Sequence, residues 1–146
     1  MIAYLRGKLV HKEPTHVIVD VGGVGYQSSI SFNTFADVKD KDEIKLHTYL
    51  HVREDAQILY GFATEAERTM FVHLISVNGV GPNTAIMVLS SLTPADLKTA
   101  ILREEVATLQ AVKGIGAKTA LRLILELRDK LLKTGCFWAI ILIITR

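Results

Sequence analysis

The sequence predicts an α+β protein in which a five-stranded β-barrel precedes an all-helical domain. Apolar residues alternate with period two in the first sixty residues, and from Thr64 onward they recur at helical spacing. The helical half also contains one ten-residue pattern twice. With 146 residues, 49% of them hydrophobic and 22% charged, the chain is long enough for two small folded domains.

Five segments of the N-terminal region have the alternation of β-strands. They read IAYLRGKLV, HVIVDVGG, GVGYQSSIS, EIKLHTYLHVR and AQILYGF. Gly22 and Gly23 form the turn between the second and third segments, where positive φ is allowed. In the fourth, Leu46 and Val52 belong to the apolar face. Because the connections are short, we expect an OB-like barrel over residues 1–62, although other five-stranded barrels share this pattern.

Helix signals begin at the sequence TEAE. Thr64 is expected to accept from the Glu67 amide while Glu67 reaches back to the Thr64 amide, as in a capping box. Another helix begins at TPADL, with Thr93 as N-cap and Pro94 at the first helical position. Residues 63–133 are therefore expected to form a domain of about five short helices.

The repeated pattern lies in this helical half. SVNGVGPNTA (76–85) aligns with AVKGIGAKTA (111–120) at an offset of 35 residues. In each copy a helix leads into a Gly-hydrophobic-Gly turn, and a new helix starts at the second glycine. The second copy opens an amphipathic helix that runs to about Lys133. Two copies at a fixed offset favour paired helix-hairpin-helix motifs over a plain glycine turn between helices.

Such hairpins suit the backbone of a nucleic acid. Glycines let the chain reverse and let a ligand approach the main chain closely. The following helix offers unpaired N–H groups and a partial positive charge to a phosphate. Val80 and Ile115 are expected to anchor the turns in the core, while Ala85 and Ala120 leave room for helix packing. A net charge of +2 alone is too small to indicate a nucleic-acid partner.

The candidate DNA-binding residues lie in and just after the two turns. They are Asn78, Gly79, Val80, Gly81, Asn83 and Thr84 in hairpin 1, and Lys113, Gly114, Ile115, Gly116, Ala117, Lys118, Thr119 and Arg122 in hairpin 2. The three basic residues of hairpin 2 would supply salt-dependent attraction to phosphate. A nucleotide-binding P-loop is disfavoured, because it needs glycine immediately before its lysine and Ala117 occupies that position.

An acidic pair stands where the fourth predicted strand ends and the fifth begins. Arg53, Glu54 and Asp55 form this tip, and a solvated turn is the ordinary explanation for such residues. If the chain binds DNA, the two carboxylates would repel phosphates, because unit charges about 4 Å apart in a partly screened site interact by about 4 kcal/mol. Such an acidic pin would push strands apart rather than bind them.

The chain carries LRGKL, VDVGGVGYQ, HVREDAQILYGF, ERTMF, NGVGPNTA and GIGAKTALRLILEL in this order. With this order and spacing, residues 1 to about 133 resemble the RuvA family of bacterial Holliday-junction-binding proteins. The most specific part of the resemblance is the acidic tip combined with two hairpins.

The resemblance implies a cytoplasmic, non-catalytic DNA-binding subunit without a cofactor, acting in recombination and repair. Four copies, or two such tetramers, would form a platform on which a four-way junction lies open and square-planar. The hairpins would hold the arms through phosphates, and Glu54 and Asp55 of each subunit would meet the crossover. The implied partners are the RuvB ATPase, which drives branch migration, and the RuvC resolvase. The single cysteine, Cys136, is compatible with a reducing compartment.

Two features differ from the family pattern. Asn83 stands where the family often has a basic residue, so hairpin 1 is expected to grip less strongly and to use backbone amides. Residues 134–146 are an atypical apolar tail, TGCFWAIILIITR, unlike a RuvB-contacting domain. We expect junction binding to survive and RuvB activation to be lost or impaired. The apolar run is about half the roughly 20 residues of a membrane helix, so no spanning segment is expected, nor a secretory signal.

Enzymatic function has little support in the sequence. A helix-hairpin-helix glycosylase places a catalytic aspartate further beyond its hairpin than Asp129 lies. Four carboxylates share one polar loop that is more typical of a solvated turn than of a metal site, namely Asp37, Asp40, Asp42 and Glu43. The five histidines lack the spacing of metal ligands, since His47 and His51 are four apart but lie on a strand. No metal is expected.

The alternative function is a generic helix-hairpin-helix module that binds duplex or single-stranded DNA without junction preference. OB barrels bind single strands through aromatic platforms. Tyr26 and Tyr49 are the candidate platform residues, but they are few and are not interleaved with basic residues.

Overall fold

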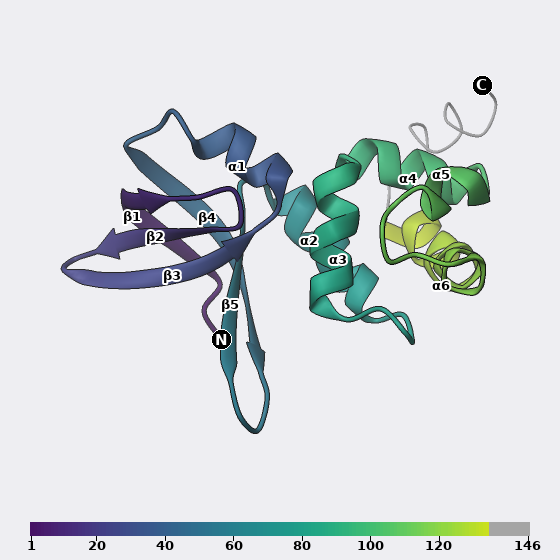
Figure 1. Cartoon of the computed structure of the whole chain (residues 1–146), viewed down its shortest axis with the longest axis horizontal. Helices are drawn as coiled ribbons and strands as arrows, with labels where there is room; N and C mark the ends of the chain where they lie inside the picture. The colour runs from purple at the N-terminus through teal and green to yellow at the C-terminus, as the bar shows by residue number, and fades with distance from the viewer. Residues whose placement is uncertain (135–146) are drawn as a thin grey trace. The chain divides into compact units, whose positions relative to one another are not determined.

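The computed structural model describes residues 1–134 (Figure 1). All but the first residue of the predicted tail therefore lies outside the described residues. The chain divides into two compact units, Met1–Thr69 and Met70–Arg146. The first contains every described strand and the second begins within a helix. A barrel followed by helices is the predicted order, which is confirmed.

The five predicted strands are all present and form a closed barrel. They are β1 (Tyr4–Lys12), β2 (His16–Val21), β3 (Val24–Ile30), β4 (Glu43–Val52) and β5 (Gln57–Phe62). Their order around the barrel is β1-β2-β3-β5-β4, and β4 closes it by pairing with β1. The β3–β5 pair is parallel and the others are antiparallel. The prediction of an OB-like barrel is thereby confirmed.

Alternating side chains fill the barrel. The core consists of Val17, Val19, Ile30, Val38, Ile44 and Leu46. The tight β2–β3 turn uses left-handed φ at Gly22 (+60°) and Gly23 (+94°), as predicted. One residue departs from the predicted apolar face: Val52 is 61% exposed, because it ends β4 at the hairpin tip, beyond the barrel core.

The connection between β3 and β4 differs from the predicted polar loop. It contains α1 (Phe32–Val38), which is capped by Ser31 Oγ accepting from the Thr34 amide at 3.1 Å. Burial of Val38 holds this short helix against the barrel. Asp37 therefore lies on a helix and Glu43 begins β4, so the prediction of four carboxylates in one loop was wrong.

Within residues 63–134, five helices follow the barrel, as the sequence predicted. They are α2 (Glu65–Ile75), α3 (Pro82–Ser91), α4 (Pro94–Leu102), α5 (Val106–Gln110) and α6 (Ala117–Thr134). Thr93 caps α4 by accepting from the Asp96 amide at 3.1 Å, with Pro94 at the first position, which confirms the predicted start. Over residues 1–134, no single helix combines the length and apolarity of a membrane span, although the bent pair α3 and α4 meets these two criteria jointly.

The start of α2 shows the first bond of the predicted capping box. Thr64 Oγ1 accepts from the Glu67 amide at 3.2 Å. The Glu67 carboxylate turns toward α1, where Oε1 accepts from Ser31 Oγ at 2.5 Å and from Thr34 Oγ1 at 2.6 Å. Glu67 is only 3% exposed, and burial raises the pKa of its carboxyl. This glutamate thus joins α1 to the start of α2.

Candidate nucleic-acid interface

The backbone hydrogen bonds that close the two turns and start the following helices recur at the offset of 35. The matching bonds are Val80 N to Val77 O (3.1 Å) with Ile115 N to Val112 O (3.1 Å), and Ala85 N to Gly81 O (3.0 Å) with Ala120 N to Gly116 O (2.9 Å). The first pair closes each turn and the second begins each following helix. The sequence repeat is therefore also a repeat of local structure.

Apolar anchors hold each turn as predicted. Val80 is 5% exposed and Ile115 is 6% exposed, so both side chains lie in the core of the helical unit. Ala85 and Ala120 are fully buried. A larger side chain at either alanine would need space that this core does not offer, because interiors are close-packed.

The two glycines of each turn have different roles. Gly79 and Gly114 adopt φ of +89° and +92°, which side chains rarely tolerate, so they make the reversal. Gly81 caps α3 with an ordinary φ of −88°. A Cβ at Gly81 or Gly116 would meet nothing within 4 Å. These second glycines leave the N-terminus of the next helix open to a ligand.

The polar residues of the hairpins lie at the surface. Asn78, Asn83, Lys113, Ala117, Lys118 and Arg122 are exposed, and Thr84 and Thr119 are half-buried. Pro82 occupies the first position of α3 and has no N–H, whereas the matching Ala117 of α6 has one. Hairpin 2 therefore has both more cations and one more backbone donor than hairpin 1.

Arg122 connects the two hairpins. Its Nη1 donates to the Asn78 carbonyl oxygen at 3.4 Å, and it lies 3.9 Å from the position that a Cβ on Gly79 would take. Arg122 belongs to α6, whereas Asn78 and Gly79 form the turn before α3. A cation of hairpin 2 thus stands beside the turn of hairpin 1, a contact that sequence spacing did not reveal.

The acidic tip forms the turn between β4 and β5, as predicted. Val52 pairs with Gln57, and the Arg53 amide donates to the Ala56 carbonyl at 2.7 Å. All residues from 53 to 56 are exposed, including both carboxylates. Figure 1 shows this hairpin extending beyond the rest of the barrel. The tip therefore offers two negative charges to any DNA that reaches it.

Three further side chains come together whose spacing along the sequence does not connect them. His11, Glu13 and His16 have possible ligand atoms all within 4.8 Å of one another. They come from two strands and the turn between them, so ligand spacing along one strand or helix did not reveal them. The available signal was the string HKEPTH, in which proline marks a turn that folds the two histidines toward each other.

Known proteins match both parts of the chain. A family model for the RuvA N terminal domain matches residues 1–61, and one for a SAM-like helix-hairpin-helix tandem matches residues 71–129. The Holliday junction branch migration complex subunit RuvA of Cytophaga hutchinsonii is 57% identical over 133 residues, which are 91% of this chain and 67% of that protein. The chain belongs to the RuvA family.

Other members of the RuvA family match over a similar share of this chain. The RuvA subunit of Christiangramia forsetii is 52% identical over 91% of this chain and 69% of its own length. That of Solibacter usitatus is 52% identical over 90% of this chain and 67% of its own length. The family resemblance expected from the six sequence segments is therefore confirmed.

Proposed function

We propose that this chain binds four-way junction DNA, the role of the branch migration complex subunits that it resembles. The observation that carries the proposal is the repeat of the turn-closing and helix-starting hydrogen bonds in the two hairpins, each ending at an open helix N-terminus. A repeated backbone clamp suits a ligand that presents the same chemical group at several places, as the arms of a junction do.

The hairpins hold these arms through phosphates. Amide N–H groups at the starts of α3 and α6 donate to phosphate oxygens, and Lys113, Lys118 and Arg122 neutralise their charge. Such contacts position the DNA without reading its sequence. Hairpin 1 has Asn83 where hairpin 2 has Lys118, so it contributes mainly through backbone donors.

The acidic tip acts at the crossover of the junction. Glu54 and Asp55 are exposed on a projecting hairpin, where they attract no phosphate and repel those that approach. We place them as a pin that keeps the strands apart at the branch point. This role requires several copies around one junction, so we propose a homotetramer or a pair of tetramers as the working assembly.

In this proposal the chain is a DNA-binding subunit without catalytic activity of its own. Its relatives are named as subunits of a branch migration complex. The family resemblance supports the RuvB ATPase as the family's motor partner and the RuvC resolvase as a further one, with RuvB activation by this chain expected to be lost or impaired. In this scheme the chain holds the junction open, while partner proteins move the branch point or cut the junction.

A gel-shift titration tests the proposal. The protein should bind an immobile four-way junction more tightly than a linear duplex of equal length and composition. Light scattering after size exclusion should show four or eight chains on each junction. Equal affinity for both DNAs would instead favour a generic helix-hairpin-helix module without junction preference.

A further inference from the structure

We propose that the β1–β2 hairpin binds one divalent transition-metal ion of the zinc class through His11, Glu13 and His16. This site lies in the barrel unit and is separate from the hairpins that we assign to DNA. The proposal does not depend on the proposed junction binding.

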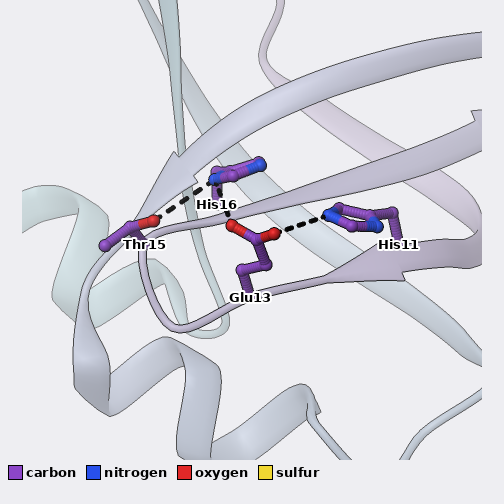
Figure 2. Close-up of polar contacts among 4 residues, drawn as sticks. All are labelled: His11, Glu13, Thr15 and His16. Atoms are coloured by element: carbon purple, nitrogen blue, oxygen red, sulfur yellow. Dashed lines mark hydrogen bonds and ion pairs between the residues drawn. The ribbon is translucent and has the colours of Figure 1, made fainter.

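The pairing of β1 with β2 places the three side chains together. The Glu13 amide donates to the His16 carbonyl at 2.9 Å, so these residues face each other across the turn. His11 lies two positions before Glu13 and therefore on the same face. Lys12, between them, donates on the other side to the Lys39 carbonyl at 2.5 Å. Figure 2 shows Glu13 lying between the two imidazole rings.

The ligand atoms lie close to the spacing of a tetrahedral site. His11 Nε2 lies 3.2 Å from Glu13 Oε1, and His16 Nδ1 lies 3.4 Å from Glu13 Oε2. Zinc bonds of about 2.0–2.1 Å place neighbouring tetrahedral ligands about 3.3–3.4 Å apart. Each imidazole nitrogen thus lies at the required distance from one oxygen of Glu13, but the two contacts use different oxygens. All candidate ligand atoms lie within 4.8 Å of one another, so rotation of these partly exposed side chains brings one carboxylate oxygen and both nitrogens to tetrahedral spacing.

The donor set selects the class of metal. Two imidazoles and one carboxylate form a three-ligand set used for zinc, with water completing the coordination. Imidazole favours zinc, copper and nickel, whereas magnesium and calcium prefer all-oxygen sites. Thr15 Oγ1 lies 3.2 Å from the same His16 Nδ1, so this contact opens when that nitrogen binds a metal. An ion at this place would tie β1 to β2 and stabilise the folded barrel.

Zinc binding to the untagged protein tests this site. The chain should carry a Cys136→Ser change, because a free thiol binds zinc and would add to the zinc count. Competition with a chromogenic chelator should give one zinc per chain, and cobalt should give the visible absorption of a tetrahedral site. His11→Ala and His16→Ala should each weaken zinc binding at least about tenfold, since even second-shell changes cost about 10–100-fold.

His47→Ala is the matched control, because His47 lies on β4 outside the cluster. It should bind zinc like the parent protein, and zinc should raise the Tm of both proteins but not of the His11 and His16 variants. Circular dichroism of the metal-free proteins should show that all variants fold. Absence of stoichiometric zinc binding, or equal affinity in the His11 and His16 variants, would overturn the proposal.

Discussion

Arg122 Nη1 donates to the carbonyl oxygen of Asn78 at 3.4 Å, across 44 residues of sequence. The contact joins the first turns of α6 to the turn that precedes α3. Because a guanidinium has five donors, Arg122 can keep this contact and still offer N–H groups to a phosphate. The two clamps are thus connected by a side chain that is itself a candidate DNA ligand.

Two substitutions of Arg122 should distinguish the contribution of its charge to DNA binding from that of its guanidinium geometry. Arg122→Ala should lower the slope of log affinity against log salt by about one, because one phosphate contact is lost. Arg122→Lys should keep most of that slope but bind more weakly than the parent, since lysine lacks the planar fork that can contact the Asn78 carbonyl and a phosphate together. Junction titrations at several salt concentrations measure both effects. An unchanged slope in Arg122→Ala would show that this cation does not contact phosphate.

The two glycines of a turn should respond differently to alanine. Gly79→Ala should lower the free energy of unfolding by about 1–2 kcal/mol, the cost of a left-handed conformation for a residue with Cβ. Its Cβ would lie 3.9 Å from Arg122, so the cost comes from φ and not from a clash. Gly81→Ala should destabilise the fold less, because φ there is −88°.

Junction affinity should show the opposite order. When both variants are compared as folded proteins, Gly81→Ala should weaken junction binding more than Gly79→Ala does. Gly81→Ala adds a methyl group in the open space before α3, where a phosphate must approach. Urea unfolding and gel shifts on both variants measure the two effects. Gly81→Ala with parental affinity would mean that DNA does not approach this helix start.

The sequence was sufficient to predict those elements whose structure depends on neighbouring residues. Strand alternation and the offset repeat predicted the barrel and both hairpins, because turns and helix starts depend on neighbouring residues. It did not predict α1, a helix of seven residues that is too short to show a period and is held by Glu67 from the start of α2. The Arg122–Asn78 contact also escaped, since it depends on how separate helices pack.

Lys118 and Asn83 occupy matching positions of the two hairpins and allow a reciprocal test. Lys118→Ala should weaken junction binding similarly for every DNA sequence and lower the salt slope by about one. Asn83→Lys should raise the slope by about one, because it gives hairpin 1 the cation that hairpin 2 has. Lys41→Ala, an exposed lysine of the barrel unit, is the control. Loss of affinity for only some sequences would contradict phosphate contact.

Glu67 should make stability depend on pH. Burial raises the pKa of its carboxyl above the ordinary 4.5, although hydrogen bonds from Ser31 and Thr34 oppose this. The folded state therefore holds the proton more tightly than the unfolded chain. The stability that this group contributes is complete below about pH 4.5 and is lost as pH rises through the folded-state pKa.

Glu67→Gln removes this titration while its amide oxygen can still accept from both hydroxyls. The variant should be more stable than the parent at pH 7, and the difference should shrink toward pH 4. Urea unfolding at both pH values measures it, with the exposed Glu65→Gln as control. A difference independent of pH would show that Glu67 has no raised pKa.

The acidic pin should oppose binding while it shapes the junction. Glu54→Gln with Asp55→Asn should tighten junction binding, because exposed charge pairs contribute about 0.2–1 kcal/mol each and two repulsive ones are removed.

Asp40→Asn with Glu43→Gln makes the same change in net charge at exposed positions away from the tip. It should leave affinity nearly unchanged if the effect is local. Linear duplex, which has no branch point, should gain less from the pin variant than a junction does. Weaker junction binding by the pin variant would exclude a repulsive role, and equal tightening by both double variants would reduce the effect to net charge.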